Sequence, residues 1–157
     1  MIHTIIKDKA TRLFLILGGF FVANALIAEF MGVKIFSLEE TFGWKPAGIK
    51  LFGESYSFNL TCGVLLWPVV FIMTDIINEY YGRKGVRFIS WMTVILIAYG
   101  FLMLFVAMQT TPNSWWIPSK QTAGIDNMSV AYNGIFGQGL GIILASMVAF
   151  LIGQLID

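Results

Sequence analysis

Four long apolar stretches alternate with polar segments along the chain. Each is about 20 residues long, the length of helix that crosses a bilayer core of about 30 Å. Backbone polar groups find no water in lipid, so such stretches are expected to be helical. The sequence therefore predicts an all-α fold, a polytopic membrane helix bundle with four transmembrane helices in a single domain, residues 1–157. The predicted helices cover residues 13–33, 60–80, 88–108 and 135–156.

The segments between these helices differ in length and charge. Long loops at residues 34–59 and 109–134 follow the first and third helices, whereas a tight basic turn near residues 82–85 joins the second helix to the third. Positive charge gathers in the N-terminal tail and in this turn, and such segments stay on the cytoplasmic side. We therefore predict a cytoplasmic N-terminus and two external loops. The charged residues are Lys7, Lys9, Arg12, Arg83, Lys84 and Arg87.

Composition supports the membrane interpretation. The chain is 57% hydrophobic and only 12% charged, whereas a soluble domain carries roughly 25% charged residues. A net charge of +1 gives no basic field for nucleic acid, so no nucleic-acid partner is expected. Cys62 is the one cysteine, which excludes an internal disulfide framework and a cysteine-rich metal site. No cofactor is expected.

A polar run interrupts the end of the second predicted helix. Asp75, Asn78 and Glu79 are three and four residues apart, so they share one helix face. A charge inside a membrane segment costs about 2.5–3.5 kcal/mol, and such residues normally face a cavity or a partner. This face is therefore a candidate substrate-binding or coupling site. A cap at the membrane interface, with Glu79 and Arg83 as an ion pair, is the alternative.

Two further polar residues lie near the end of the fourth predicted helix. Gln154 and Asp157 are three residues apart. The second and fourth helices run in the same direction in the predicted topology, so these side chains should lie at the depth of the first polar run. We include both residues in the candidate site.

Small residues recur every fourth position along the fourth predicted helix. Such a stripe lets another helix approach closely, so we assign it to helix packing. Its members are Gly137, Gly141, Ala145, Ala149 and Gly153.

Three other interruptions fall inside predicted helices. Asn24 could hydrogen-bond across helices, and Glu29 is either functional or merely interfacial. Pro68 is expected to kink the second helix, because proline lacks an amide N–H. The membrane segments contain no histidine and no nucleophile paired with a base, so the chain is not expected to be an enzyme.

The run from Trp67-Pro68 through Thr74-Asp75-Ile76-Ile77-Asn78-Glu79-Tyr80-Tyr81-Gly82-Arg83-Lys84 strongly resembles the queuosine precursor transporter family, also called the VUT family. The segments Gly134–Gly137 and Gly153–Asp157 are similar to that family as well. Its members are bacterial and archaeal inner-membrane proteins that import the 7-deazaguanine bases preQ0 and preQ1 for queuosine modification of tRNA. They usually have six membrane helices, so the resemblance implies that this chain is a fragment without the last two.

The resemblance implies an inner-membrane transporter whose partners are the lipid bilayer and a small deazapurine base. Asp75 and Glu79 would carry recognition or proton coupling, while Asn78 and Gln154 orient the base. Aromatic side chains would stack on the base. Two alternatives stay open: a substrate-binding subunit of a multi-component vitamin-type importer, and a structural helix-bundle subunit. Homo-oligomer formation is also open. The candidate stacking residues are Trp67, Phe71, Tyr80 and Tyr99.

Overall fold

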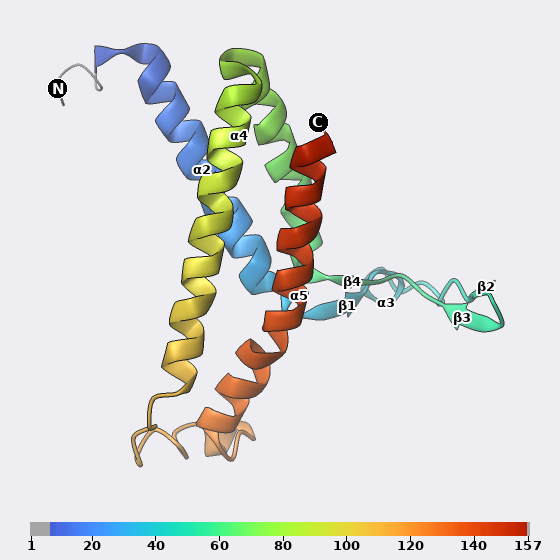
Figure 1. Cartoon of the computed structure of the whole chain (residues 1–157). Helices are drawn as coiled ribbons and strands as arrows, with labels where there is room; N and C mark the ends of the chain where they lie inside the picture. The colour runs from blue at the N-terminus through green and yellow to red at the C-terminus, as the bar shows by residue number, and fades with distance from the viewer. Residues whose placement is uncertain (1–6, 157) are drawn as a thin grey trace.

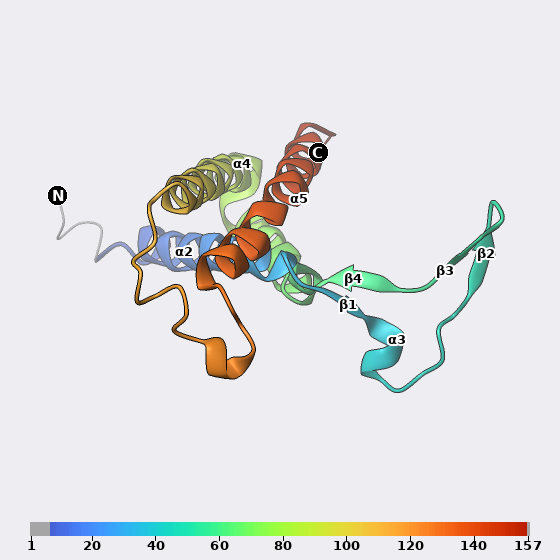
Figure 2. The same ribbon diagram turned by 90° about the horizontal axis from the view of Figure 1, so that it is seen from below.

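Helices make up most of the chain. The computed structural model describes residues 7–156, although several side chains of the last helix, at 138–140, 142–143, 146, 150–151 and 153–156, lie outside the described set. A slender arm of short strands projects sideways from the helices (Figure 2). The fold is therefore mostly helical as predicted, with strands that an all-α fold does not include. The long helices are α2 (Lys9–Gly32), α4 (Trp67–Met108) and α5 (Met128–Ile156) (Figure 1).

Helix α2 begins at Lys9, four residues before the predicted start. The carboxylate of Asp8 caps it, accepting the backbone N–H of Thr11 at 3.0 Å and the hydroxyl of the same residue. These bonds hold the pKa of Asp8 below its usual value. A capping carboxylate satisfies amides that have no partner within the helix. The helix therefore extends through polar residues that hydropathy alone excludes.

The second predicted helix, at residues 60–80, starts later than expected. Asn59–Thr61 is strand β4, and Cys62–Leu65 is a 3-10 turn. Helix α4 begins at Trp67, which places Pro68 in its first turn. An amide there has no helical acceptor, so the missing N–H of proline costs no hydrogen bond. The predicted kink at Pro68 is therefore wrong.

Helix α4 is a hairpin with two arms. Gly82 has φ 66° and ψ −179°, a conformation essentially confined to glycine, and it reverses the chain. A first arm (67–81) and a second arm (83–108) lie antiparallel on either side of it (Figure 1). The tight turn predicted at residues 82–85 thus needs only one non-helical residue, and the third helix starts at residue 83 rather than 88.

Helix α2 packs against both arms of the hairpin. Phe21 is fully buried in one cluster with Ile77 of the first arm and Ile89 of the second. The 3-10 turn approaches α2 so closely that a Cβ on Gly63 would lie 2.5 Å from the carbonyl oxygen of Ala28. Only glycine fits this contact, which joins the base of the projecting strand arm to the helices.

Helix α5 joins the bundle through a smaller cluster. Met147 packs against Ala25 of α2 and against Ile97 and Phe101 of the second arm. The helix begins at Met128, seven residues before the predicted start. Asn127 explains the earlier start, because its side-chain oxygen accepts the backbone N–H groups of residues 129 and 130.

The projecting arm is held together by one buried carboxylate. Glu39 is 4% exposed and accepts the backbone N–H of Ala47 at 3.1 Å and of Phe58 at 3.0 Å. These bonds, led by those from Phe58, hold the pKa of Glu39 below its ordinary value of 4.5. The arm comprises β1 (Ile35–Ser37) paired with β4, the single turn α3 (Leu38–Thr41), and β2 (Ile49–Leu51) paired with β3 (Glu54–Tyr56).

Glu39→Gln is expected to loosen the arm, since an amide offers one acceptor oxygen where the carboxylate offers two. The backbone amides of Ala47 and Phe58 should then exchange with deuterium faster. Because folding lowers the pKa of Glu39, its bonds contribute stability above about pH 4.5 and lose it as the pH falls through the lower folded value. Glu40→Gln, at an exposed neighbouring position, should leave the deuterium exchange of both amides unchanged. Unchanged exchange in Glu39→Gln would contradict this role.

Two helices, α2 and α4, are long and apolar enough to cross a membrane. Their most apolar windows are only 39% and 33% buried, whereas the core helix of a soluble protein is mostly buried. Leu15, Ile16 and Ile95 are each more than half exposed. Apolar faces of this size suit contact with lipid or another protein. The number of crossings, four in the sequence analysis, stays a prediction.

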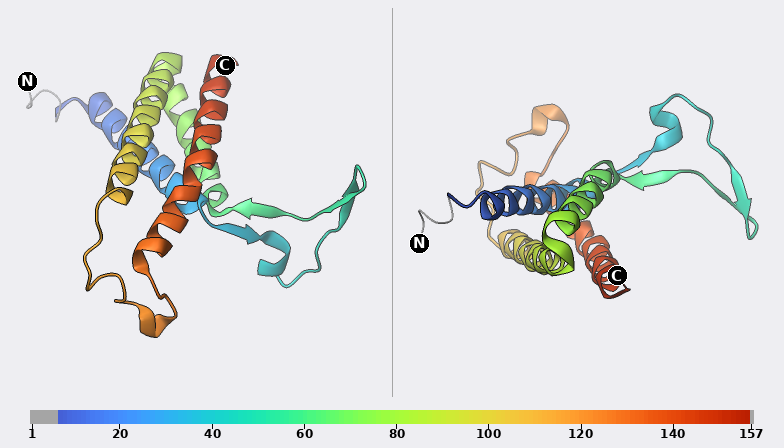
Figure 3. Two further views of the ribbon diagram at one scale, coloured as in Figure 1. Left: turned by 60° about the horizontal axis from the view of Figure 1, so that its bottom comes forward. Right: turned by 90° about the horizontal axis from the view of Figure 1, so that it is seen from above.

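The ends of the helices gather at two levels. The start of α2, the turn at Gly82 and the C-terminal end of α5 lie at one end of the bundle, and the 109–127 loop lies at the other (Figures 1 and 3). The first arm of α4 and the 3-10 turn before it together rise about 30 Å. This length matches the thickness of a bilayer core.

Candidate functional site

The polar run lies on the outer side of the first arm of α4. Asp75, Asn78 and Glu79 are all exposed, whereas Met73 and Ile77 are buried against α2. Asp75 is seven residues before the hairpin turn, so it lies about 10 Å along the helix from it. The three polar side chains therefore form an exposed polar surface near the hairpin turn and do not enter the described core.

The predicted pairing of Glu79 with Arg83 is absent. Both residues are described, and the structure places no ion pair between them. Gly82 interrupts the helix between these residues, so the spacing of four residues no longer brings their side chains onto one face. The ion-pair explanation of Glu79 is therefore wrong.

Two predicted site residues cannot be compared with the polar run. The side chain of Gln154 and the whole of Asp157 lie outside the described residues. The C-terminal end of α5 does lie at the same end of the bundle as the hairpin turn (Figure 1). The convergence of the two polar groups stays a prediction.

The predicted stacking residues do not form one group. Trp67 lines a pocket inside the bundle, and its ring centroid is 5.8 Å from that of Phe71. Phe71, Tyr80 and Tyr99 are each more than half exposed. Of the four aromatic residues, only Trp67 is placed beside an enclosed space.

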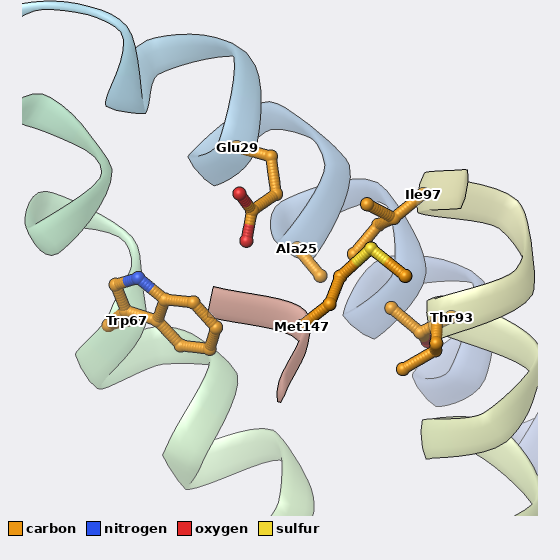
Figure 4. A pocket seen from close by; sticks show the side chains of 7 residues that line it. Ala25, Glu29, Trp67, Thr93, Ile97 and Met147 are labelled. Carbon is orange, nitrogen blue, oxygen red and sulfur yellow. The ribbon is translucent and has the colours of Figure 1, made fainter. Parts of the chain in front are cut away.

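The pocket lies where α2, both arms of α4 and α5 meet. Figure 4 shows the carboxylate of Glu29 pointing from α2 toward the indole of Trp67, with Met147 of α5 between these residues and the second arm. The cavity is small, about 10 Å³, and partly open to the surroundings. It thus combines one acid and one large aromatic ring in an otherwise mostly apolar lining. The lining residues are Ala25, Glu29, Trp67, Thr93, Val94, Ile97 and Met147.

Glu29 is the residue that sequence reasoning undervalued. Its side chain is 7% exposed, so it is not a surface group at the membrane interface. Asn24 is also buried, but its amide donates to the carbonyl oxygen of Phe20 at 2.8 Å within α2, so the expected bond across helices is replaced by a local one. A single carboxylate in an apolar stretch was the signal for Glu29.

The small-residue stripe of α5 faces away from the rest of the described chain. Nothing lies within 4 Å of a Cβ built on Gly137 or Gly141, and Ala145 and Ala149 are exposed. The surroundings of Gly153 lie outside the part of the chain that the structure describes. The stripe therefore makes no helix contact within this part of the chain, and its packing role stays a prediction.

Acidic side chains are the remaining candidates for binding a polar ligand. Among residues 7–156, no three His, Cys, Asp or Glu side chains gather as metal ligands would. The acidic residues that lie within the long helices are the buried Glu29 and the exposed pair Asp75 and Glu79.

No curated protein and no solved structure matches the chain. The model of the protein family described as "Putative vitamin uptake transporter" matches residues 61–157. The matched part is more than half of the chain, and it includes α4, α5, the polar run and Trp67. The chain belongs to this family of vitamin-type uptake transporters.

Proposed function

We propose that the protein imports the 7-deazaguanine bases preQ0 and preQ1 across the bacterial cytoplasmic membrane. Membership of the uptake-transporter family supports transport. The likeness of the run Thr74–Lys84 to queuosine precursor transporters supports this class of base. The basic hairpin turn faces the cytoplasm in this proposal, because positive loops stay inside.

The observation that carries the proposal is the polar face of the first arm. Asp75, Asn78 and Glu79 are exposed on a helix, within about 10 Å of the turn. Charges at this depth are costly unless they meet a polar partner. A guanine-like ring offers adjacent N–H and NH₂ donors, and a carboxylate accepts two such bonds at once.

The role of each residue in this proposal follows from its side-chain chemistry. Asp75 and Glu79 accept the base donors or carry the coupling proton. Asn78 and Gln154 orient the ring, because an amide both donates and accepts. Asp157 completes this inner group. The base reaches the cytoplasm from here, since the group lies next to the basic turn.

The proposal is tested in cells that cannot make queuosine precursors. Expression of the protein should restore queuosine in tRNA when preQ1 is supplied at low concentration. A strain with the empty vector is the control. A protein that is folded in the membrane and restores no queuosine would contradict the proposal. Restoration only with a second, energising protein would favour the substrate-binding subunit instead.

A further inference from the structure

The outer part of the projecting arm is a two-stranded hairpin, β2 and β3, with two different faces. Residues paired across the strands lie on one face, and side chains alternate between the faces along each strand. Ile49 pairs with Tyr56, and Leu51 follows two residues later, so these three side chains share a face. Lys50 pairs with Ser55 on the other. One face is therefore mostly apolar and the other is polar.

The apolar face of this hairpin is open. All six residues of β2 and β3 are exposed, and so is 96% of Phe52 in the turn between them. The one acid on this face, Glu54, is paired with Leu51 beside the turn, and its carboxylate accepts the hydroxyl of Tyr56 at 3.3 Å. An isolated two-stranded hairpin is marginally stable at best in water. A surface that covers the apolar face would therefore stabilise it.

The arm leaves the helices at the level where α2 ends and α4 begins. It runs sideways, across the direction of the helices (Figures 1 and 2). The first arm of α4 and the 3-10 turn before it rise about 30 Å, the thickness of a bilayer core. With the turn at Gly82 at one surface of a bilayer, the projecting arm begins at the other and extends along it.

We propose that the projecting arm binds the headgroup region of the bilayer that the helices span, on the side away from Gly82. Ile49, Leu51 and Tyr56 face the acyl chains, and Lys50 and Ser55 face water. Amphipathic helices bind membranes in the plane of the interface with the same division of apolar and polar faces. Binding of the arm to lipid is independent of the substrate that the protein carries.

The other side chains of the arm suit this surface. Tryptophan and tyrosine are enriched at the level of the headgroups, and Trp44 is 63% exposed, with its ring stacked on that of Phe42 at 5.1 Å. Three lysines balance three glutamates between residues 34 and 61, so apolar contact rather than net charge would hold the arm to lipid. The carboxylate of Glu39 accepts backbone amides on both sides of the hairpin, which fixes the hairpin to the rest of the arm.

Fluorescent labels on the two faces of the hairpin test the inference. The full chain with Cys62→Ser carries an environment-sensitive NBD label at Leu51→Cys or, as the matched control, at Ser55→Cys. It is placed in liposomes that contain lipids with a nitroxide on the acyl chain near the headgroup. The Leu51→Cys label should emit at shorter wavelength and be quenched by these lipids, whereas the Ser55→Cys label should be quenched by iodide in the water.

Two results would overturn the inference. One is equal quenching of both labels, whether by the lipid nitroxide or by iodide. The other is a Leu51→Cys label that neither quencher reaches, because a second copy of the chain or another protein then covers the apolar face.

A second measurement uses unlabelled protein in nanodiscs. Leu51→Ser should speed deuterium exchange of the hairpin amides by about tenfold, because the apolar side chain that holds the hairpin to the interface is lost. Lys50→Ser, on the polar face of the same strand, should leave the exchange unchanged. Equal exchange in Leu51→Ser and wild type would contradict a lipid contact at this face. Neither experiment measures uptake of preQ1, so a failure here leaves the proposed function standing.

Discussion

Asp75→Asn is expected to lower the initial rate of preQ1 uptake by about 10- to 100-fold. The substitution keeps the size and one acceptor oxygen but removes the charge. A hydrogen bond to a charged group contributes about 1.5–3 kcal/mol, and each 1.4 kcal/mol is a factor of ten. Loss of a proton-carrying group would reduce uptake at least as much. The rate is measured in cells with labelled preQ1, at equal amounts of protein in the membrane.

The matched control is Asp126→Asn, which makes the same change at an exposed position in the loop before α5. Uptake by this variant should equal that of the wild type. If Asp75→Asn also transports at the wild-type rate, Asp75 has no part in transport.

Gly82→Ala is expected to destabilise the hairpin by about 1–3 kcal/mol, the cost of holding a residue with a Cβ in a region of backbone space essentially confined to glycine. Gly82 has φ 66° and ψ −179°, and no neighbouring atom lies within 4 Å of a Cβ built there. The penalty is thus one of backbone strain, not of crowding. Thermal unfolding in detergent should shift downward by several degrees, since 1 kcal/mol corresponds to about 2–4 °C at this chain length.

Gly19→Ala provides the control for the hairpin variant. Gly19 lies within α2 and likewise has nothing within 4 Å of a built Cβ, but it carries no positive φ. Alanine favours a helix more than glycine by about 1 kcal/mol, so this variant should be as stable as the wild type or more so. Equal melting temperatures for Gly82→Ala and wild type would show that the chain can reverse without glycine.

Hydropathy predicted the helix positions correctly where an apolar stretch is helical along its whole length. The core of α2 and the end of α4 at Met108 lie where the apolar stretches predict them. Residues 60–66 are as apolar as the helix that follows, so hydropathy joined them to it. Their strand and 3-10 turn depend on pairing with Ile35–Ser37, a contact between distant segments that local pattern does not contain.

The candidate site was predicted only in part, because it too depends on contacts between distant segments of the chain. The shared face of Asp75, Asn78 and Glu79 depends on helical spacing, which sequence gives directly. The pocket depends on Glu29 of α2, Trp67 of α4 and Met147 of α5 meeting in space. Only the tertiary packing turns a lone acid in an apolar stretch into a pocket residue, and only it separates Trp67 from the other aromatic candidates.

The central claim is that this protein alone moves 7-deazaguanine bases across a membrane. The most direct measurement is uptake of labelled preQ1 by liposomes that contain only the purified protein and lipid. Accumulation above protein-free liposomes that excess unlabelled preQ0 suppresses is the predicted result. No uptake by correctly folded protein, with a proton gradient of either direction or none, would contradict the claim.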